Sequence, residues 1–196
     1  MSAGAVRYLV MPTPNLSDGV LDIRAVQPAD IDAIRQWRNA QMDVLRQTAP
    51  ISPEEQERYF SEHVWSQIAS SEPSQILLAL ESAGVLIGYG GLVHISWPNR
   101  RAEVSFLLTP DLETKSDELI ALFSRFLALM KKLAFEDLGL RRLCTETFAH
   151  RTRHIATLEA SGFRHEGCLR EHVLIEGKPM DSIVHGLLAF EWKNDH

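Results

Sequence analysis

Residues 102–148 read AEVSFLLTPDLETKSDELIALFSRFLALMKKLAFEDLGLRRLCTETF, and this stretch decides the fold. The almost continuous apolar run at 102–108 is typical of a central strand that is buried on both faces. Over residues 116–136 the apolar side chains recur every three or four positions, which predicts a helix with one face on the core. Another apolar run, 140–148, predicts a second strand. The stretch therefore predicts a strand–helix–strand crossover within one sheet.

Upstream of this stretch the pattern predicts a strand, two helices and a hairpin. Residues 21–26 alternate in the manner of a strand. Pro28 and Asp30 open one helix, and Ser52 opens the next as an N-cap residue followed by proline and two glutamates. Two apolar runs, at 75–81 and 85–94, predict a hairpin.

Downstream, a short helix is predicted at 152–161, a strand at 163–168, and a last hairpin from the runs 171–175 and 180–190. The fold class is therefore α/β (α+β). We expect a mixed, mainly antiparallel sheet of six to seven strands with helices on both faces. Residues 21–192 are predicted to form a single domain, and residues 1–20 a tail or edge strand.

Composition narrows the class of protein. Of the 196 residues, 45% are hydrophobic and 23% are charged, as in globular proteins. The net charge of -6 disfavours nucleic acid as a partner. Cys144 and Cys168 form no metal-binding or redox spacing, so no metal is expected. The longest apolar helix candidate is too short and too charged to cross a membrane. We therefore expect a cytoplasmic protein without a membrane partner.

Four segments, taken in order, resemble the GNAT superfamily of acetyl-CoA-dependent N-acetyltransferases. They are most similar to the branch that holds ribosomal-protein N-terminal acetyltransferases and nucleotide-amino-sugar N-acetyltransferases. The segments are IRQWRN at 34–39 with ISPEE at 51–55, IGYGG at 87–91, GFRHEGCLREH at 162–172, and GKPMDS at 177–182. The resemblance covers residues 21–192.

The resemblance implies that acetyl-CoA is the cofactor and that a substrate amine attacks its thioester directly. It also implies a sheet splayed between its fourth and fifth strands. Here that is a wedge-shaped gap between residues 104–108 and 143–147 that admits the pantetheine arm. The implied cofactor contacts are Phe106, Leu107, Leu108, Thr109, Lys115, Ser116, Arg151 and His154.

The turn that should hold the cofactor's diphosphate departs from the family's glycine-rich pattern. Residues 109–116 contain no glycine, and Pro110 lacks an N–H donor. Four carboxylates stand in or just beyond the turn, against one lysine, and they oppose a bound anion. They are Asp111, Glu113, Asp117 and Glu118. An alternative interpretation is that the acids only charge-match a helix N-terminus, with Thr114 and Asp117 as a capping box.

A small basic cluster offers a replacement for the lost anion site. It consists of His150, Arg151, Arg153 and His154, at the start of the predicted helix 152–161. Arginine binds phosphate through two parallel hydrogen bonds, so the cluster would take up the diphosphate. The alternative is that these four side chains form an ordinary solvent-exposed stretch that binds no ligand. Leu158 stands where many members of the family carry a general-acid tyrosine.

Three side chains are candidates for the chemistry. Glu103 would accept the amine proton as a base, or it would pair with Arg100 or Arg101. His94 is a second candidate base, or a packed loop histidine. Glu146, on the other side of the wedge, would bind the ammonium. Separately, Ser105 or Cys144 would touch the thiolate, or would serve as core residues.

For the acceptor, the resemblance points to the first two helices. An arginine beside aromatic rings, as in Trp37, Arg38 and Tyr59, would hold a nucleotide or a sugar phosphate. Trp37 would otherwise fill the core. His172 and Asp181 are predicted to meet across the last hairpin, where the family often places acceptor contacts or the edge of a homodimer.

The leading hypothesis is an acetyl-CoA-dependent N-acetyltransferase that acts on a primary amine of a small molecule such as an amino sugar. A second hypothesis is a GNAT-fold binding or assembly module that has lost catalysis, which the acidic turn and Leu158 favour. A third is a protein N-terminal acetyltransferase. A long acidic groove would favour that peptide acceptor, whereas a closed pocket with aromatic and arginine walls would favour a sugar.

Overall fold

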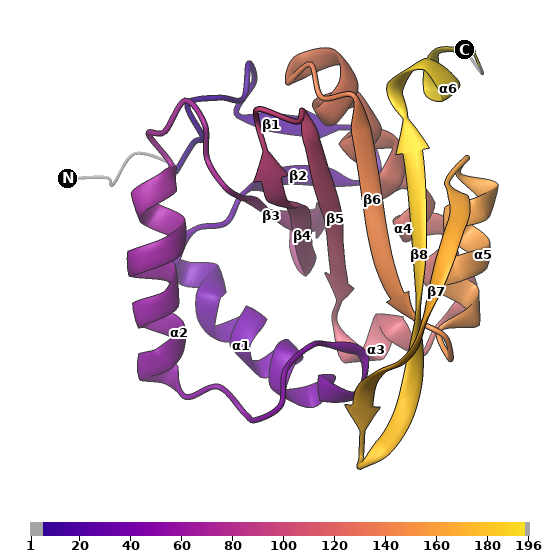
Figure 1. The fold of residues 1–196 in the computed structure, drawn as a ribbon. Coiled ribbons are helices and arrows are strands. Elements are labelled where there is room, and N and C mark those ends of the chain that lie inside the picture. Colours follow the sequence, from indigo (N-terminus) through magenta and orange to yellow (C-terminus); the bar gives the residue numbers. More distant parts are fainter. Residues whose placement is uncertain (1–5, 195–196) are drawn as a thin grey trace.

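The computed structural model describes residues 6–194, which form one eight-stranded sheet with helices against both faces (Figure 1). The strands lie in the order β1-β2-β3-β4-β5-β6-β8-β7. Only β5 and β6 pair in parallel; the other neighbours are antiparallel. The strands are β1 Asn15–Ser17, β2 Asp22–Ala25, β3 Ile76–Ser82, β4 Val85–Ser96, β5 Arg101–Leu108, β6 Arg142–Phe148, β7 Arg164–Ile175 and β8 Lys178–Leu188.

The predicted fold class is confirmed, but the strand count differs from the expected six to seven. The short edge strand β1 adds one strand by pairing with β2. The two strands predicted at 163–168 and 171–175 are one long strand, β7, because the pairing with β8 resumes after a register shift between Leu169 and Val173. Within that shift, Glu171 has a φ of 51°.

Within residues 6–194, six α-helices flank the sheet. They are α1 Ile31–Ala40, α2 Pro53–Tyr59, α3 Pro110–Glu113, α4 Ser116–Lys132, α5 Thr152–Ala160 and α6 Ala189–Asn194. Short 3₁₀ and π turns extend or connect them: η1 Pro28–Asp30, η2 Met42–Val44, η3 Phe60–Val64, η4 Trp65–Gln67 and η5 Leu133–Asp137. No helix in the described part of the chain is long and apolar enough to cross a membrane.

The start of α2 follows the local sequence, as predicted. The backbone N–H of Glu55 donates to the Ser52 hydroxyl at 3.2 Å. The carboxylate of Glu55 accepts from the backbone N–H of Ser52 at 2.8 Å. Pro53 occupies the first helical turn, where its missing N–H costs nothing. These reciprocal bonds fix where the helix begins.

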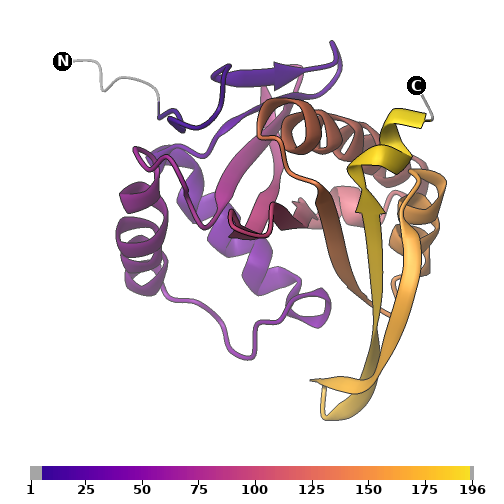
Figure 2. The ribbon, with the colours of Figure 1, turned by 45° about the horizontal axis from the view of Figure 1, so that its top comes forward.

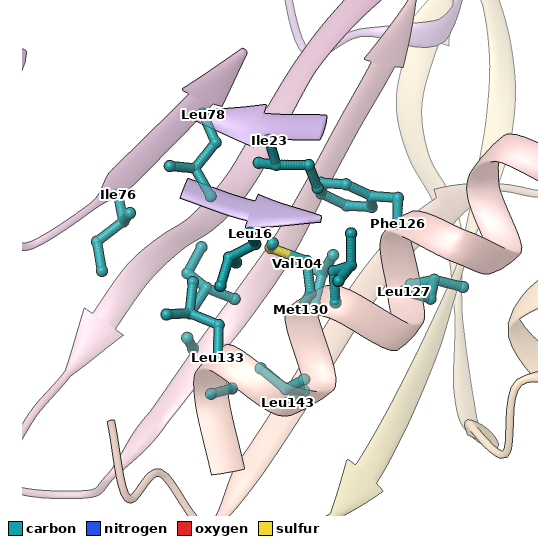
Figure 3. Close-up of a cluster of buried hydrophobic side chains, with 14 of the residues drawn as sticks. Leu16, Ile23, Ile76, Leu78, Val104, Phe126, Leu127, Met130, Leu133 and Leu143 are labelled. Carbon is teal, nitrogen blue, oxygen red and sulfur yellow. The ribbon is translucent and has the colours of Figure 1, made fainter. Parts of the chain in front are cut away.

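The sheet has a hydrophobic core on each face. On one face α4 buries the apolar stripe predicted from its sequence, and Figure 3 shows Phe126, Met130 and Leu133 packed among side chains of the strands. On the other face Ile34 of α1 and Phe60 of η3 pack on β3, β4 and β5. Figure 2 shows α1 and α2 on the side opposite α4 and α5.

The N-terminal segment is part of the first of these cores. Tyr8 and Met11 are each 1% exposed. The hydroxyl of Tyr8 accepts a hydrogen bond from the backbone N–H of Leu77 at 3.0 Å. Residues 1–5 of the predicted tail lie outside the described residues, and the division of the chain at residue 20 stays a prediction.

The sheet opens between β5 and β6. The two strands pair only at Arg101↔Arg142, Ala102↔Leu143 and Glu103↔Cys144. Beyond Glu103 they separate, because β6 stays paired with β8 along its whole length (Figure 1). The predicted splay is therefore present, and it falls between the fifth and sixth strands only because β1 adds one to the count.

Candidate active site

Three neighbouring cavities follow the opening in the sheet. The helix cavity, of about 540 Å³, lies between α1, α2 and strands β3 to β5. The wedge cavity, of about 340 Å³, lies between β5 and β6. The α5 cavity, of about 350 Å³, lies at the start of α5 and is lined by Glu113 of α3. Arg38, Arg46, Val93 and Ser105 line both of the first two, and Val44 and Arg151 line both of the last two. The cavities therefore lie side by side along the opening, and we call them together the cleft.

Two carboxylates face each other across the wedge cavity. Glu103 is the last residue of β5 that pairs with β6, and Glu146 lies two residues beyond Cys144, the last residue of β6 that pairs with β5. Nη2 of Arg46 lies 3.0 Å from Oε1 of Glu103 and 2.8 Å from Oε2 of Glu146. The two glutamates are largely shielded, at 20% and 17% side-chain exposure. The arginine thus holds both acids at the point where the helix and wedge cavities meet.

A histidine stands beside each carboxylate. Nδ1 of His94 lies 3.0 Å from Oε2 of Glu103, and Nε2 of His172 lies 3.7 Å from Oε1 of Glu146. The alternative pairing of Glu103 with Arg100 or Arg101 is therefore wrong, since its partners are Arg46 and His94. Because Arg46 follows η2, in a segment without apolar periodicity, the sequence carried no signal for this contact.

The predicted contact between His172 and Asp181 is also wrong. The carboxylate of Asp181 accepts a hydrogen bond from the backbone N–H of Glu171 at 2.7 Å. The left-handed backbone at Glu171 directs that N–H toward β8, and His172 then faces Glu146 on β6 instead. The hairpin therefore contributes to the site through His172, whereas Asp181 serves the hairpin itself.

The helix cavity has arginine and aromatic walls. Arg38 of α1 donates to the Tyr89 hydroxyl at 2.7 Å and to Gln47 at 3.1 Å. Burial raises the pKa of Tyr89, against the opposing effect of Arg38, so this hydroxyl is neutral. Tyr59 lines the same cavity and donates to Gln75. Trp37 packs in the hydrophobic cluster beneath α1 and lines none of the three cavities named above.

The basic cluster at α5 is less basic than its sequence predicts. Burial and the charge of Arg151 lower the pKa of His154 to about 3, so this imidazole is neutral. Its ring centroid lies 5.1 Å from that of Phe123, which places it against the core. Nη2 of Arg151 lies 2.6 Å from Nε2 of His154 and 2.7 Å from Oε1 of Glu113. The cluster therefore combines a neutral histidine with a salt-bridged arginine.

The remaining predicted cofactor contacts lie along β5 and the following turn. Phe106 lines the wedge cavity and stacks on Phe123. Leu107 and Leu108 are buried in opposite cores, so β5 can present only their backbone to a ligand. The backbone N–H of Thr109 donates to Ile87. Ser116 is the first residue of α4.

The proposed capping box of Thr114 and Asp117 is wrong. Lys115 occupies the N-cap position of α4 without a side-chain hydrogen bond. The hydroxyl of Thr114 donates to the carbonyl of Asp111, because α3 forms a separate helical turn before α4 begins. Lys115 lies 3.5 Å from Glu118. The acidic turn is therefore built around α3, which carries Glu113 into the α5 cavity.

We expect His154 to make stability depend on pH. An unfolded histidine titrates near 6.5 and the folded one near 3, so the unfolded chain binds the extra proton between these values. The free energy of unfolding should fall as the pH drops through this window, by up to about 1.4 kcal/mol per pH unit from this residue. Urea unfolding between pH 7 and 4 measures it. A His154→Gln variant should show a shallower pH dependence than the exposed control His150→Gln; equal slopes would contradict the assignment.

Comparison with known proteins agrees with this geometry. A family model described as an acetyltransferase (GNAT) domain matches residues 23–184. YdaF of Bacillus subtilis strain 168, named as a ribosomal N-acetyltransferase, is 29% identical over 112 residues, which is 57% of this chain and 58% of that protein.

Solved structures share the architecture. The spermidine N-acetyltransferase from Vibrio cholerae in complex with CoA and spermine has a TM-score of 0.77 at 23% identity, over 90% of this chain and 100% of that one. A dodecameric structure of spermidine N-acetyltransferase from the same organism has a TM-score of 0.75 at 22% identity, over 91% of this chain and 99% of that one. At sequence identities of 22% and 23%, the similarity to these structures shows a shared fold.

Proposed function

The chain belongs to the GNAT acetyltransferase family, whose members take the acetyl group from acetyl-CoA, and we propose that it acetylates a primary amine of a small molecule by direct attack. One observation carries the proposal. The wedge cavity, which Glu103 and Glu146 line, adjoins the helix cavity at Arg46 and Ser105. A thioester in the first and an amine in the second would therefore meet beside two carboxylates.

The residues of the cleft suit acetyl-CoA. Residues 104–108 of β5 have no strand partner on the β6 side. Apart from the Leu108 carbonyl, which accepts a hydrogen bond from Gln41, that edge can receive the amide groups of a pantetheine arm. Arg151 and Arg153 line the α5 cavity at the far end, and Nε of Arg151 is buried without a hydrogen-bond partner among the described residues. This unused donor suits a phosphate. When bound, the cofactor supplies the acetyl group as a thioester.

The chain's own residues supply a base and an electrostatic frame. Glu103 accepts the proton that the ammonium must lose before the amine can attack, directly or through a water molecule. Glu146 faces the same point and attracts the positively charged amine. Arg46 positions both carboxylates through its two contacts. Ser105, which lines both cavities, is the proposed contact of the departing thiolate, because Leu158 is buried and has no proton to give.

The walls of the helix cavity favour an amino sugar that carries an anionic group. Arg46 also lines the cavity, but it already holds Glu103 and Glu146. Arg38 and Arg58 remain against one carboxylate, Glu55, and Tyr59 adds an aromatic face. Guanidinium groups bind phosphates and repel cations, so the cavity suits a sugar phosphate or a sugar nucleotide better than a polyamine. A cavity of about 540 Å³ also lies in the range of small-molecule sites.

A thiol-release assay with acetyl-CoA and a panel of amines tests the function. We expect turnover with phosphorylated or nucleotide-linked amino sugars, and at least tenfold lower kcat/KM with spermidine and with peptides that have a free N-terminus. Preference for a peptide would favour the protein N-terminal acetyltransferase, and preference for spermidine would contradict the anionic acceptor. Binding of acetyl-CoA without turnover on any amine would favour the binding module. Assembly as a homodimer and a cytoplasmic location stay predictions.

A further inference from the structure

The carboxylate of Glu113 contacts Arg151 in the α5 cavity, at the far end of the cleft. Oε1 of Glu113 lies 2.7 Å from Nη2 of Arg151, and the two side chains are 20% and 11% exposed. The same nitrogen lies 2.6 Å from Nε2 of His154. Because this histidine is neutral, it accepts from Arg151 and leaves Glu113 as the only anion on that guanidinium among the described residues.

The contact between the two side chains leaves polar atoms unused. Oε2 of Glu113 and Nε of Arg151 are both buried, and neither has a hydrogen-bond partner in the described part of the chain. An arginine can offer two parallel N–H donors to one anion, but only one nitrogen of Arg151 meets Glu113. The guanidinium therefore retains the capacity to bind a ligand that takes both donors.

We propose that Glu113 competes with the phosphate groups of the cofactor for Arg151, and that it leaves the guanidinium when coenzyme A binds. The inference rests on the proposed function, since coenzyme A is the ligand that the cleft receives. The α5 cavity adjoins the wedge cavity at Val44 and Arg151, so one coenzyme A molecule could place its thiol in the wedge cavity and a phosphate beside Arg151.

The position of Glu113 in the chain allows this exchange. It is the last residue of α3, a single turn of helix between β5 and the N-terminus of α4. Nη2 of Arg151 has two hydrogens, which Glu113 and His154 already take, so a phosphate that binds this nitrogen must displace the carboxylate. The acidic, glycine-free turn would then weaken cofactor binding by competition. In the free protein it would keep a charged partner on an arginine that is only 11% exposed.

Titration calorimetry with coenzyme A measures the competition. Glu113→Gln keeps the shape of the side chain and removes its charge, and it should lower the Kd at least fivefold. The matched control is Asp111→Asn, an exposed carboxylate on the same helical turn, which should change the Kd less than twofold. Pantetheine has no phosphate, so the Kd of Glu113→Gln for pantetheine should equal that of the wild type.

The outcomes separate the competition from the proposed function. Equal Kd values of Glu113→Gln and Asp111→Asn for coenzyme A, or an equal gain with pantetheine, would overturn the competition even if the wild type binds and acetylates. Binding by Glu113→Gln alone would support it. No binding by either protein would overturn both proposals. If Glu113→Gln fails to fold, Glu113→Asp withdraws the carboxylate by one methylene and should also lower the Kd, by a smaller factor.

Discussion

Replacing Glu103 with Gln should lower kcat by about 10²- to 10⁴-fold, which is the usual contribution of a general base. The carboxylate lines the wedge cavity and is held by Arg46 and His94, each at 3.0 Å. Glutamine keeps the size and hydrogen-bonding shape of this side chain but cannot take a proton from an ammonium. The loss should therefore appear in kcat, while the Kd for coenzyme A stays near that of the wild type.

Initial rates of thiol release at saturating acetyl-CoA and acceptor measure this effect. Glu57→Gln, an exposed residue of α2, is the matched control and should retain the wild-type rate. A Glu103→Gln enzyme with kcat within fivefold of the wild type would exclude Glu103 as the base. Glu146→Gln would then be the next variant to measure.

Replacing Gly91 with Ala should destabilise the protein by about 3 kcal/mol or more, because a side chain there combines backbone strain with overpacking. Gly91 has a φ of 134°, and an added Cβ would lie 2.0 Å from the carbonyl oxygen of Ile76. That oxygen belongs to the backbone of β3 in the middle of the sheet, so it cannot move away without breaking strand pairing. Glu103 lies on β5, which pairs with β4. Its position therefore depends on the close approach of β4 to β3 at Gly91.

Urea unfolding gives the free energy of unfolding for this comparison. Gly167→Ala is the matched control, because an added Cβ at Gly167 meets nothing within 4 Å. It should change the free energy of unfolding by less than about 1 kcal/mol. A Gly91→Ala protein as stable as this control would show that β3 and β4 can separate locally at little cost.

The parts of the fold that were predictable are those encoded by local periodicity. The stripe of α4 and the N-cap at Ser52 need only neighbouring residues, and both are confirmed. The three-residue strand β1 has too little pattern to stand out. The continuity of β7 depends on a left-handed backbone at Glu171. Glutamate rarely adopts this conformation, so the local sequence does not predict it.

The candidate site was predictable as a set of residues but not as a set of contacts. Glu103, Glu146 and Arg151 were singled out in the sequence, and the structure places all three along one cleft. Their partners are remote in the chain: Arg46 is 57 residues from Glu103 and 100 from Glu146. Such pairs depend on how the strands separate, so only the folded arrangement could reveal Arg46 or the contact of Glu113 with Arg151.

A crystal structure of the protein with coenzyme A tests most directly whether acetyl transfer takes place between β5 and β6. We expect the pantetheine arm along residues 104–108 of β5, the thiol beside Glu103, and the diphosphate on Arg151 with Glu113 displaced. Coenzyme A bound outside this cleft, with β5 and β6 still enclosing only side chains, would contradict the proposed site.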